Sequence, residues 1–346
     1  MGAAFSAPGK RKIRRLVRYC FAMKGIWLRR LLWPLTIAVL GYVFYSTPVR
    51  EVWASIQSAA GWTLPVVGLS VLLVFFADAF AMGRTFSWFA TPISYREAVI
   101  VRGASYPIAL VNYALGQGAF AFFLHRSRGL PFRRSAATIL LVMGINLLLL
   151  LFMAAIGMAL TDSSTIPATL VSQVRIVRIL IIAGFVGLAF YGTIIATKPR
   201  LLARWPVFDV LLSAGVGGHL KALLVRVPHI VSLVVFSYLY LLAFGVNVPI
   251  KQALLFLPVA FLVAAVPLPG QGVGVSQLIM REMFSPYASG DLSAQQAAVV
   301  GASFAGQFIA MLVQILVGLI CLRSQLGSQL RTQSSQSNST EQSDHG

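Results

Sequence analysis

The sequence predicts an all-α integral membrane protein with about six transmembrane helices and two oppositely oriented re-entrant helical hairpins. Three observations predict this fold class. Of the 346 residues, 58% are hydrophobic and 11% are charged, whereas a soluble domain carries about 25% charged residues. Apolar runs long enough to cross a bilayer recur along the chain. Two further apolar stretches, at about 95–124 and 251–284, are interrupted by glycine and proline.

The second interrupted stretch contains the sequence Val266-Pro267-Leu268-Pro269-Gly270-Gln271-Gly272-Val273-Gly274. Proline lacks a backbone N–H and clashes with the preceding helical turn, and glycine lowers helix propensity. In hydrocarbon each freed backbone group needs a partner, so such a break is tolerated only inside protein or beside a watery cavity. This stretch is therefore predicted to be a re-entrant hairpin, with half-helices over about 251–266 and 273–284.

The first interrupted stretch follows the same plan. Its sequence Leu115-Gly116-Gln117-Gly118-Ala119 resembles Pro269-Gly270-Gln271-Gly272-Val273. Matched residues flank both breaks: Arg96-Glu97-Ala98 and Lys251-Gln252-Ala253 before them, Pro107 and Pro258 within the first arms, and Arg126 and Arg281 after the second arms. An inverted repeat of this kind is typical of transporters built from two similar halves.

The predicted transmembrane spans cover about residues 31–45, 62–82, 135–160, 176–197, 230–246 and 296–322, within a membrane domain of residues 31–322. Basic and apolar residues alternate in residues 1–30, as in an interfacial helix, although a simple positive retention signal fits equally well. Residues 199–229 are too polar to cross and are expected to lie along the interface. Residues 323–346 are rich in Ser, Gln, Asn and Thr, and we expect a disordered cytoplasmic tail.

The chain is strongly basic, with a net charge of +19. The charge is spread through short loops between apolar spans, which favours contact with anionic lipid headgroups over nucleic acid. More Lys and Arg fall on the side of the N-terminus, so both termini are predicted in the cytoplasm of a bacterial inner membrane. In this orientation the two hairpins start from opposite sides, and their turns meet near the midplane.

The meeting turns are the predicted binding site. A helix that begins beside each turn points unpaired N–H groups at the membrane centre, where they favour phosphate or carboxylate. The two turn glutamines add donors and acceptors without a buried charge. In the alternative, the glutamines only bridge the hairpins and the glycines allow tight packing. The predicted substrate-binding residues are Gln117, Gln271, Gly116, Gly118, Gly270, Gly272, Gly274, Pro267, Pro269, Asn112, Gln277, Arg126 and Arg281.

Isolated polar residues have functional and structural interpretations. Asp78 is an acidic residue inside a predicted span, and it is a functional candidate because acids within membrane spans are rare and costly. It also lies near the cytoplasmic end of that span, where it could reach the interface or pair with an arginine of the first hairpin. Arg126 and Arg281 could attract lipid phosphates or only anchor the arms. Asn112 and Asn146 are expected to bond helices together rather than contact substrate.

Several other kinds of site are disfavoured. The glycines of residues 270–274 lack the strand–turn–helix context of a dinucleotide fingerprint. Cys20 and Cys321 do not indicate a disulfide framework. Neither a metal site nor a catalytic arrangement can be assembled from the scattered histidines and acids, so we expect no cofactor and no enzymatic activity. The histidines are His125, His219, His229 and His345.

Two regions resemble the flippase-like transmembrane domain of the lysylphosphatidylglycerol synthase family, as a stand-alone membrane member without the synthase domain. In residues 112–129, Asn112, Gly118 and Arg126 stand where that family has an Asn, a Gly and a basic residue. Residues 267–275 resemble its Pro-x-Pro-Gly-Gly-x-Gly-x-x-Glu signature. The resemblance implies lipid movement between leaflets.

This sequence departs from the family pattern at acidic positions. Gln277 stands in place of the usual Glu, Gln271 is an insertion, and Ala119 and Asn146 stand near positions that are often acidic. The departures imply that a member of this kind lacks proton coupling, and works passively or does not transport.

The predicted function is to bind an anionic lipid, of phospholipid or polyprenyl-phosphate type, and to translocate it between leaflets. The alternative is a non-transporting lipid-binding subunit that partners a membrane enzyme or an envelope-assembly complex. A membrane-embedded lipid-modifying enzyme is disfavoured, because the predicted site offers no titratable group.

Overall fold

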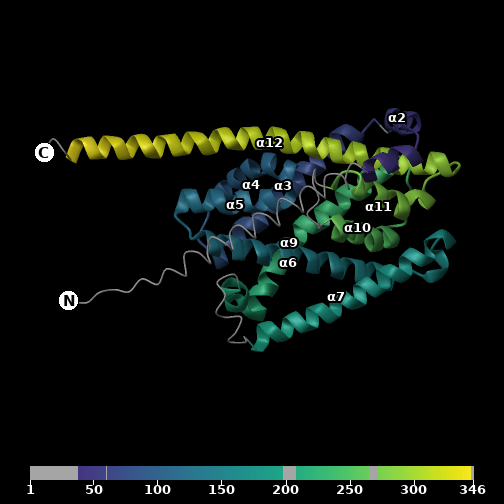
Figure 1. Ribbon diagram of the computed structural model, residues 1–346, viewed down its shortest axis with the longest axis horizontal. Helices are drawn as coiled ribbons and strands as arrows, with labels where there is room; N and C mark the ends of the chain where they lie inside the picture. Colours follow the sequence, from purple (N-terminus) through teal and green to yellow (C-terminus); the bar gives the residue numbers. More distant parts are fainter. Residues whose placement is uncertain (1–37, 60, 198–207, 265–271, 344–346) are drawn as a thin grey trace, which may run out of the picture.

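The computed structural model describes residues 38–59, 61–197, 208–264 and 272–343. These residues form helices and contain no strand (Figure 1). Among the helices of these described residues, five are long and apolar enough to cross a membrane, which indicates a multi-pass membrane protein. They are α3 (Thr63–Phe89), α6 (Phe132–Leu160), α7 (Val171–Thr197), α9 (Asp209–Ala243) and α12 (Leu292–Ser343).

Four of these helices coincide with predicted spans, namely 62–82, 135–160, 176–197 and 296–322. The predicted first span, 31–45, lies mostly outside the described residues. Its last part is helical over residues 38–46. There Val43 is buried, and the ring of Phe44 stacks on Phe304 of α12. The short helix α2 (Val49–Ser58) follows.

The predicted interfacial segment and the predicted fifth span form one helix, α9. A left-handed Gly215 (φ 58°) kinks it near its start, and it continues without interruption to Ala243. The expectation of a separate interfacial segment is therefore wrong for residues 216–229. One reason is that two of its basic side chains, Arg226 and His229, face an acidic partner inside the protein. Paired charges can be buried where single ones cannot.

Four shorter helices form two pairs. Helix pair 1 consists of α4 (Tyr95–Val111) and α5 (Tyr113–Arg128), and helix pair 2 of α10 (Ile250–Ala264) and α11 (Val275–Phe284). Their lengths of 17, 16, 15 and 10 residues fall short of the roughly 20 residues that cross a bilayer. The turn of pair 2, with Pro267, Pro269, Gly270 and Gln271, lies outside the described residues.

The two helix pairs begin and end at opposite ends of α6 (Figure 1). In pair 1, Glu97 at the start of α4 binds Arg128 at the end of α5. This end adjoins the start of α6, where Arg134 Nε donates to the carbonyl of Phe89 at 3.0 Å. At the other end of α6, Gln252 at the start of α10 donates to the carbonyl of Thr165 at 2.9 Å. The starting ends of the two pairs therefore lie at opposite ends of α6.

The break in helix pair 1 lies at Asn112, not at Gln117 as the sequence predicts. Asn112 is extended (φ −162°), and its Oδ1 accepts from the backbone N–H groups of Ala114 and Leu115. This N-cap starts α5 five residues before Gln117. Gly116 and Gly118 are thus helical residues. A β-carbon at Gly116 would lie 2.3 Å from Cβ of Ala109, so this glycine permits close contact between α4 and α5.

Small residues also bring α4 close to α12. A β-carbon at Gly103 would lie 2.4 Å from Sγ of Cys321, and one at Gly318 would lie 2.6 Å from Cδ of Pro107. Such close crossings give van der Waals contact in place of the hydrophobic effect, which does not operate between helices in lipid. They fix the inner face of α4 against the bundle.

The helix α12 runs through Ser343, and the disordered cytoplasmic tail expected at residues 323–346 stays a prediction. No proline occurs between Leu292 and Ser343 to end the helix. The part of α12 that is apolar enough to cross a membrane ends at Ser324. The predicted interfacial segment 1–30 lies outside the described residues.

Candidate functional site

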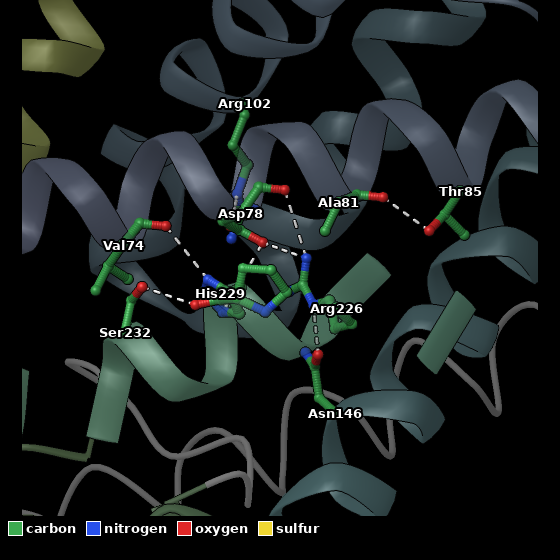
Figure 2. A network of polar contacts seen from close by, with 10 residues as sticks. Val74, Asp78, Ala81, Thr85, Arg102, Asn146, Arg226, His229 and Ser232 are labelled. Atoms are coloured by element: carbon green, nitrogen blue, oxygen red, sulfur yellow. Dashed lines mark hydrogen bonds and ion pairs between the residues drawn. The ribbon is translucent and has the colours of Figure 1, made fainter. Parts of the chain in front are cut away.

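Four charged or titratable side chains from three helices meet in the interior; we call them the Asp78 cluster (Figure 2). Asp78 lies on α3, Arg102 on α4, and Arg226 and His229 on α9. Arg102 Nε donates to Asp78 Oδ2, and Arg226 Nη1 lies 2.5 Å from Oδ1. His229 Nε2 is 3.9 Å from the same Oδ1. All four side chains are buried.

Neutral partners orient the basic members of the cluster. Arg226 Nε donates to Oδ1 of Asn146 on α6 at 2.6 Å. His229 Nδ1 lies 3.3 Å from the carbonyl of Val74, which makes it the donor of that hydrogen bond. The Arg102 guanidinium lies over the ring of Tyr106, 5.1 Å from its centroid. Asn146 thus bonds helices together, as the sequence predicts.

The cluster adjoins a central cavity of about 390 Å³, within the size range of ligand pockets. Asp78, Arg102 and His229 line one part of it, and the remaining walls are mostly apolar. Both helix pairs contribute lining residues. Pair 1 provides Arg102, Tyr106, Ala109 and Tyr113, and pair 2 provides Leu257, Ala260, Phe261, Ser276, Gln277 and Met280.

An amide pair lines the cavity on the side of helix pair 2. Gln277 is fully buried. Its Oε1 accepts from the backbone N–H of Gly274 at 2.6 Å, and its Nε2 donates to Oε1 of Gln307 on α12 at 2.7 Å. Gln277 therefore caps the start of α11 and joins that helix to α12. The cavity has charged groups near pair 1 and neutral amides near pair 2.

A second cavity lies between α6, α7, α9 and α10; we call it the lateral cavity. Its volume is about 530 Å³, and its walls are nearly all Leu, Ile, Val and Gly. Leu147 of α6 lines both cavities. The helix α7, at the edge of the bundle in Figure 1, is little buried by the rest of the protein. The lateral cavity is thus an apolar space beside the polar central one.

Of the predicted site residues, Asp78 and Gln277 line the central cavity. Asp78 pairs with Arg102 of helix pair 1. This confirms the alternative in which Asp78 pairs with an arginine of the first hairpin, and not the alternative in which it reaches the interface. Gln117 is buried in α5, with an Oε1 that has no hydrogen-bond partner in the described part of the chain. Its predicted counterpart Gln271 lies outside that part, so the structure does not describe a contact between them.

The remaining predicted residues serve their own helices. Asn112 caps α5. Gly118 has open space beside it, and Gly272 and Gly274 have positive φ angles of 74° and 91° before α11. Arg126 is exposed at the end of α5. Arg281 is buried, donates to Ser46 and Glu282, and lies 5.4 Å from the ring centroid of Tyr42. Arg281 thus anchors α11, in agreement with the structural interpretation of this residue.

Sequence reasoning allowed an arginine of the first hairpin as the partner of Asp78 but did not identify Arg102. It missed Arg226 and His229 because it placed residues 199–229 along the interface. The available signal was the position of each arginine. Arg102 follows Val99-Ile100-Val101, and Arg226 and His229 are spaced i, i+3 on one helical face. Basic residues inside apolar helices usually face a bundle interior.

The chain matches no known protein family and no curated protein. Within the described residues, no group of three or more His, Cys, Asp or Glu side chains could hold a metal ion. The arrangement offers a polar, partly charged cavity inside an apolar bundle.

Proposed function

We propose that this chain binds an anionic lipid in the central cavity and moves it between the leaflets of a bacterial inner membrane, with both termini in the cytoplasm. One observation carries the proposal: both helix pairs line one cavity of about 390 Å³ inside a bundle of apolar helices. A ligand that is apolar throughout would not need the polar lining, and a small polar ligand would not need so much apolar wall. A lipid headgroup with its chains satisfies both conditions.

The arrangement of the helix pairs supports movement across the membrane. Each pair is too short to cross, and the pairs begin at opposite ends of α6. Two re-entrant hairpins of opposite orientation would make the cavity reachable from either side when one pair shifts against the bundle. The resemblance to the flippase-like domain of the lysylphosphatidylglycerol synthase family points in the same direction.

The proposal is tested by lipid exchange in proteoliposomes. Vesicles contain a fluorescent phosphatidylglycerol, and a membrane-impermeant reductant bleaches the outer leaflet. A protein that exchanges lipid exposes the inner pool as well. The variant Ala310→Phe fills the central cavity from α12, and Ala159→Phe places the same ring on the exposed face of α6. Lipid exchange is expected for wild type and Ala159→Phe and should be lost in Ala310→Phe. If wild type and both variants exchanged lipid no faster than protein-free vesicles, translocation would be refuted.

The alternative is a lipid-binding subunit that does not transport, and the exposed face of α7 favours it. Only a small part of this helix is covered by the described residues. A partner helix could pack there and receive lipid from the lateral cavity. In that case the wild type would bind lipid without exchange, and activity would appear only with a co-purified protein.

A further inference from the structure

The charges of the Asp78 cluster do not balance. Asp78 is the one buried acidic side chain among the described residues, and it pairs with both Arg102 and Arg226. Arginine stays protonated in proteins, so two positive charges face one negative charge. A single carboxylate neutralises one guanidinium. An uncompensated charge inside a membrane bundle is strongly unfavourable, so a further negative charge is required.

The geometry shows where that negative charge would bind. Arg226 is held by Asp78 and Asn146. Arg102 uses its Nε for Asp78, while its Nη1 is buried and has no hydrogen-bond partner among the described residues. Arg102 also lines the central cavity. Since nearly all buried donors in proteins are satisfied, this nitrogen marks the place of an acceptor that enters through the cavity.

We propose that the Arg102 guanidinium binds a lipid phosphodiester that carries one negative charge. This inference rests on the proposed function and names its substrate class. One negative charge completes the balance with Arg102, Arg226 and Asp78. A phosphomonoester carries about −1.5 to −2 at neutral pH and would leave an excess negative charge. The lining has no lysine and no second acid among its described residues, so the cavity offers nothing further to bind a dianion.

The lateral cavity favours a lipid over a free anion. Its walls are nearly all apolar, and Leu147 lines both this cavity and the central one. A headgroup bound in the central cavity would thus have a neighbouring space suited to an acyl chain. A free phosphate would leave that space unused.

Native mass spectrometry of the full chain tests the inference. The protein is offered equal amounts of phosphatidylglycerol, phosphatidic acid and phosphatidylcholine with the same acyl chains, and inorganic phosphate separately. Wild type should retain one phosphatidylglycerol in preference to the other lipids, and no phosphate. Arg102→Gln should lower this preference over phosphatidylcholine at least about tenfold, since hydrogen bonds to charged groups are worth more than neutral ones. Arg50→Gln, at an exposed arginine of α2, is the matched control and should bind as wild type does.

Two further variants separate charge from folding. Arg102→Gln leaves Asp78 paired with Arg226, so the cluster becomes neutral and the protein should remain monodisperse. Arg102→Lys keeps the charge and should keep the preference for phosphatidylglycerol over phosphatidylcholine. Loss of the preference in both variants would mean that Arg102 acts only through packing, and would overturn the proposal. Retention of phosphatidic acid over phosphatidylglycerol, retention of phosphate alone, or equal binding by Arg102→Gln would overturn it too.

The exchange assay distinguishes this failure from failure of the proposed function. Exchange without Arg102-dependent retention of phosphatidylglycerol would overturn the headgroup assignment and leave translocation intact. Arg102-dependent retention without exchange would support the headgroup assignment and overturn translocation.

Discussion

Corresponding residues at the start of the two helix pairs make different contacts. Glu97 of α4 binds Arg128 at the end of α5, so it closes pair 1 upon itself. Gln252 of α10 donates instead to Thr165, and ties pair 2 to the segment after α6. The second arms differ in the same way, since Arg126 is exposed and Arg281 is buried against Ser46. Similar sequence positions therefore do not have similar structural roles.

The inner parts of the pairs differ in charge. Pair 1 is held to α3 by the ion pair of Arg102 and Asp78. Pair 2 is held by the amide pair of Gln277 and Gln307 and by close backbone contact, since a β-carbon at Gly157 would lie 2.3 Å from the backbone nitrogen of Leu255. Electrostatics thus positions one pair, and shape positions the other. This difference gives each pair its own sensitivity to substitution.

The largest effect is expected from Asp78→Asn. The variant leaves Arg102 and Arg226 buried without a counter-charge, and loss of one partner from a buried pair costs about 3–5 kcal/mol. Thermal unfolding in detergent should show a large drop in midpoint. Gln277→Leu, in pair 2, removes only neutral hydrogen bonds worth about 1 kcal/mol each and serves for comparison. Equal unfolding midpoints for Asp78→Asn and Gln277→Leu would contradict the conclusion that electrostatics positions pair 1 and packing positions pair 2.

The two glycines of Gly116-Gln117-Gly118 should respond in opposite directions. A β-carbon at Gly116 would collide with Ala109, and overpacking costs about 1–3 kcal/mol. At Gly118 there is no atom within 4 Å of an added β-carbon, so alanine should stabilise α5 by up to about 1 kcal/mol. Thermal unfolding of Gly116→Ala and Gly118→Ala measures both effects, and each variant controls for the other. Two variants of equal stability would show that α4 and α5 do not approach closely at Gly116.

The long apolar helices could be predicted because length and composition alone decide them. The predicted spans 62–82 and 135–160 match α3 and α6, whose residues are mostly apolar. The break in pair 1 could not be placed correctly. Gly-Gln-Gly has low helix propensity, yet Asn112 ends one helix and caps the next by a side-chain contact that propensity does not describe.

The charged part of the site could be predicted only in part, because its members are distant in sequence. Hydropathy treats Arg226 as a polar residue that should avoid the membrane. Its partner Asp78 is 148 residues away, and pairing between them depends on the packing of α3 against α9. The sequence alone identifies Asp78 as an intramembrane acid and allows an arginine of the first hairpin as its partner. It does not indicate that Arg226 is a second partner.

A smaller effect is expected at the break of pair 1. Asn112→Ala removes the side-chain oxygen that accepts from Ala114 and Leu115, and loss of such a cap costs about 1 kcal/mol. Asn112→Asp keeps an acceptor and should lose less. Unfolding midpoints of the two variants give the comparison. If alanine and aspartate were equivalent, the cap would not determine where α5 begins.

The smallest effect is expected where pair 1 closes on itself. Arg128 Nε donates to Glu97 at 2.8 Å, and these hydrogen bonds raise the pKa of Arg128. The guanidinium is nearly half exposed, and an exposed ion pair contributes about 0.2–1 kcal/mol. Glu97→Gln should therefore lower the unfolding midpoint slightly at low salt, and the difference from wild type should shrink at high salt because exposed charges are screened. The buried pair of Asp78 and Arg102 is shielded from salt, so the effect of Asp78→Asn should persist. A salt dependence of equal size at both positions would place the Asp78 cluster in contact with bulk water, and would remove the electrostatic distinction between the two ends of α4.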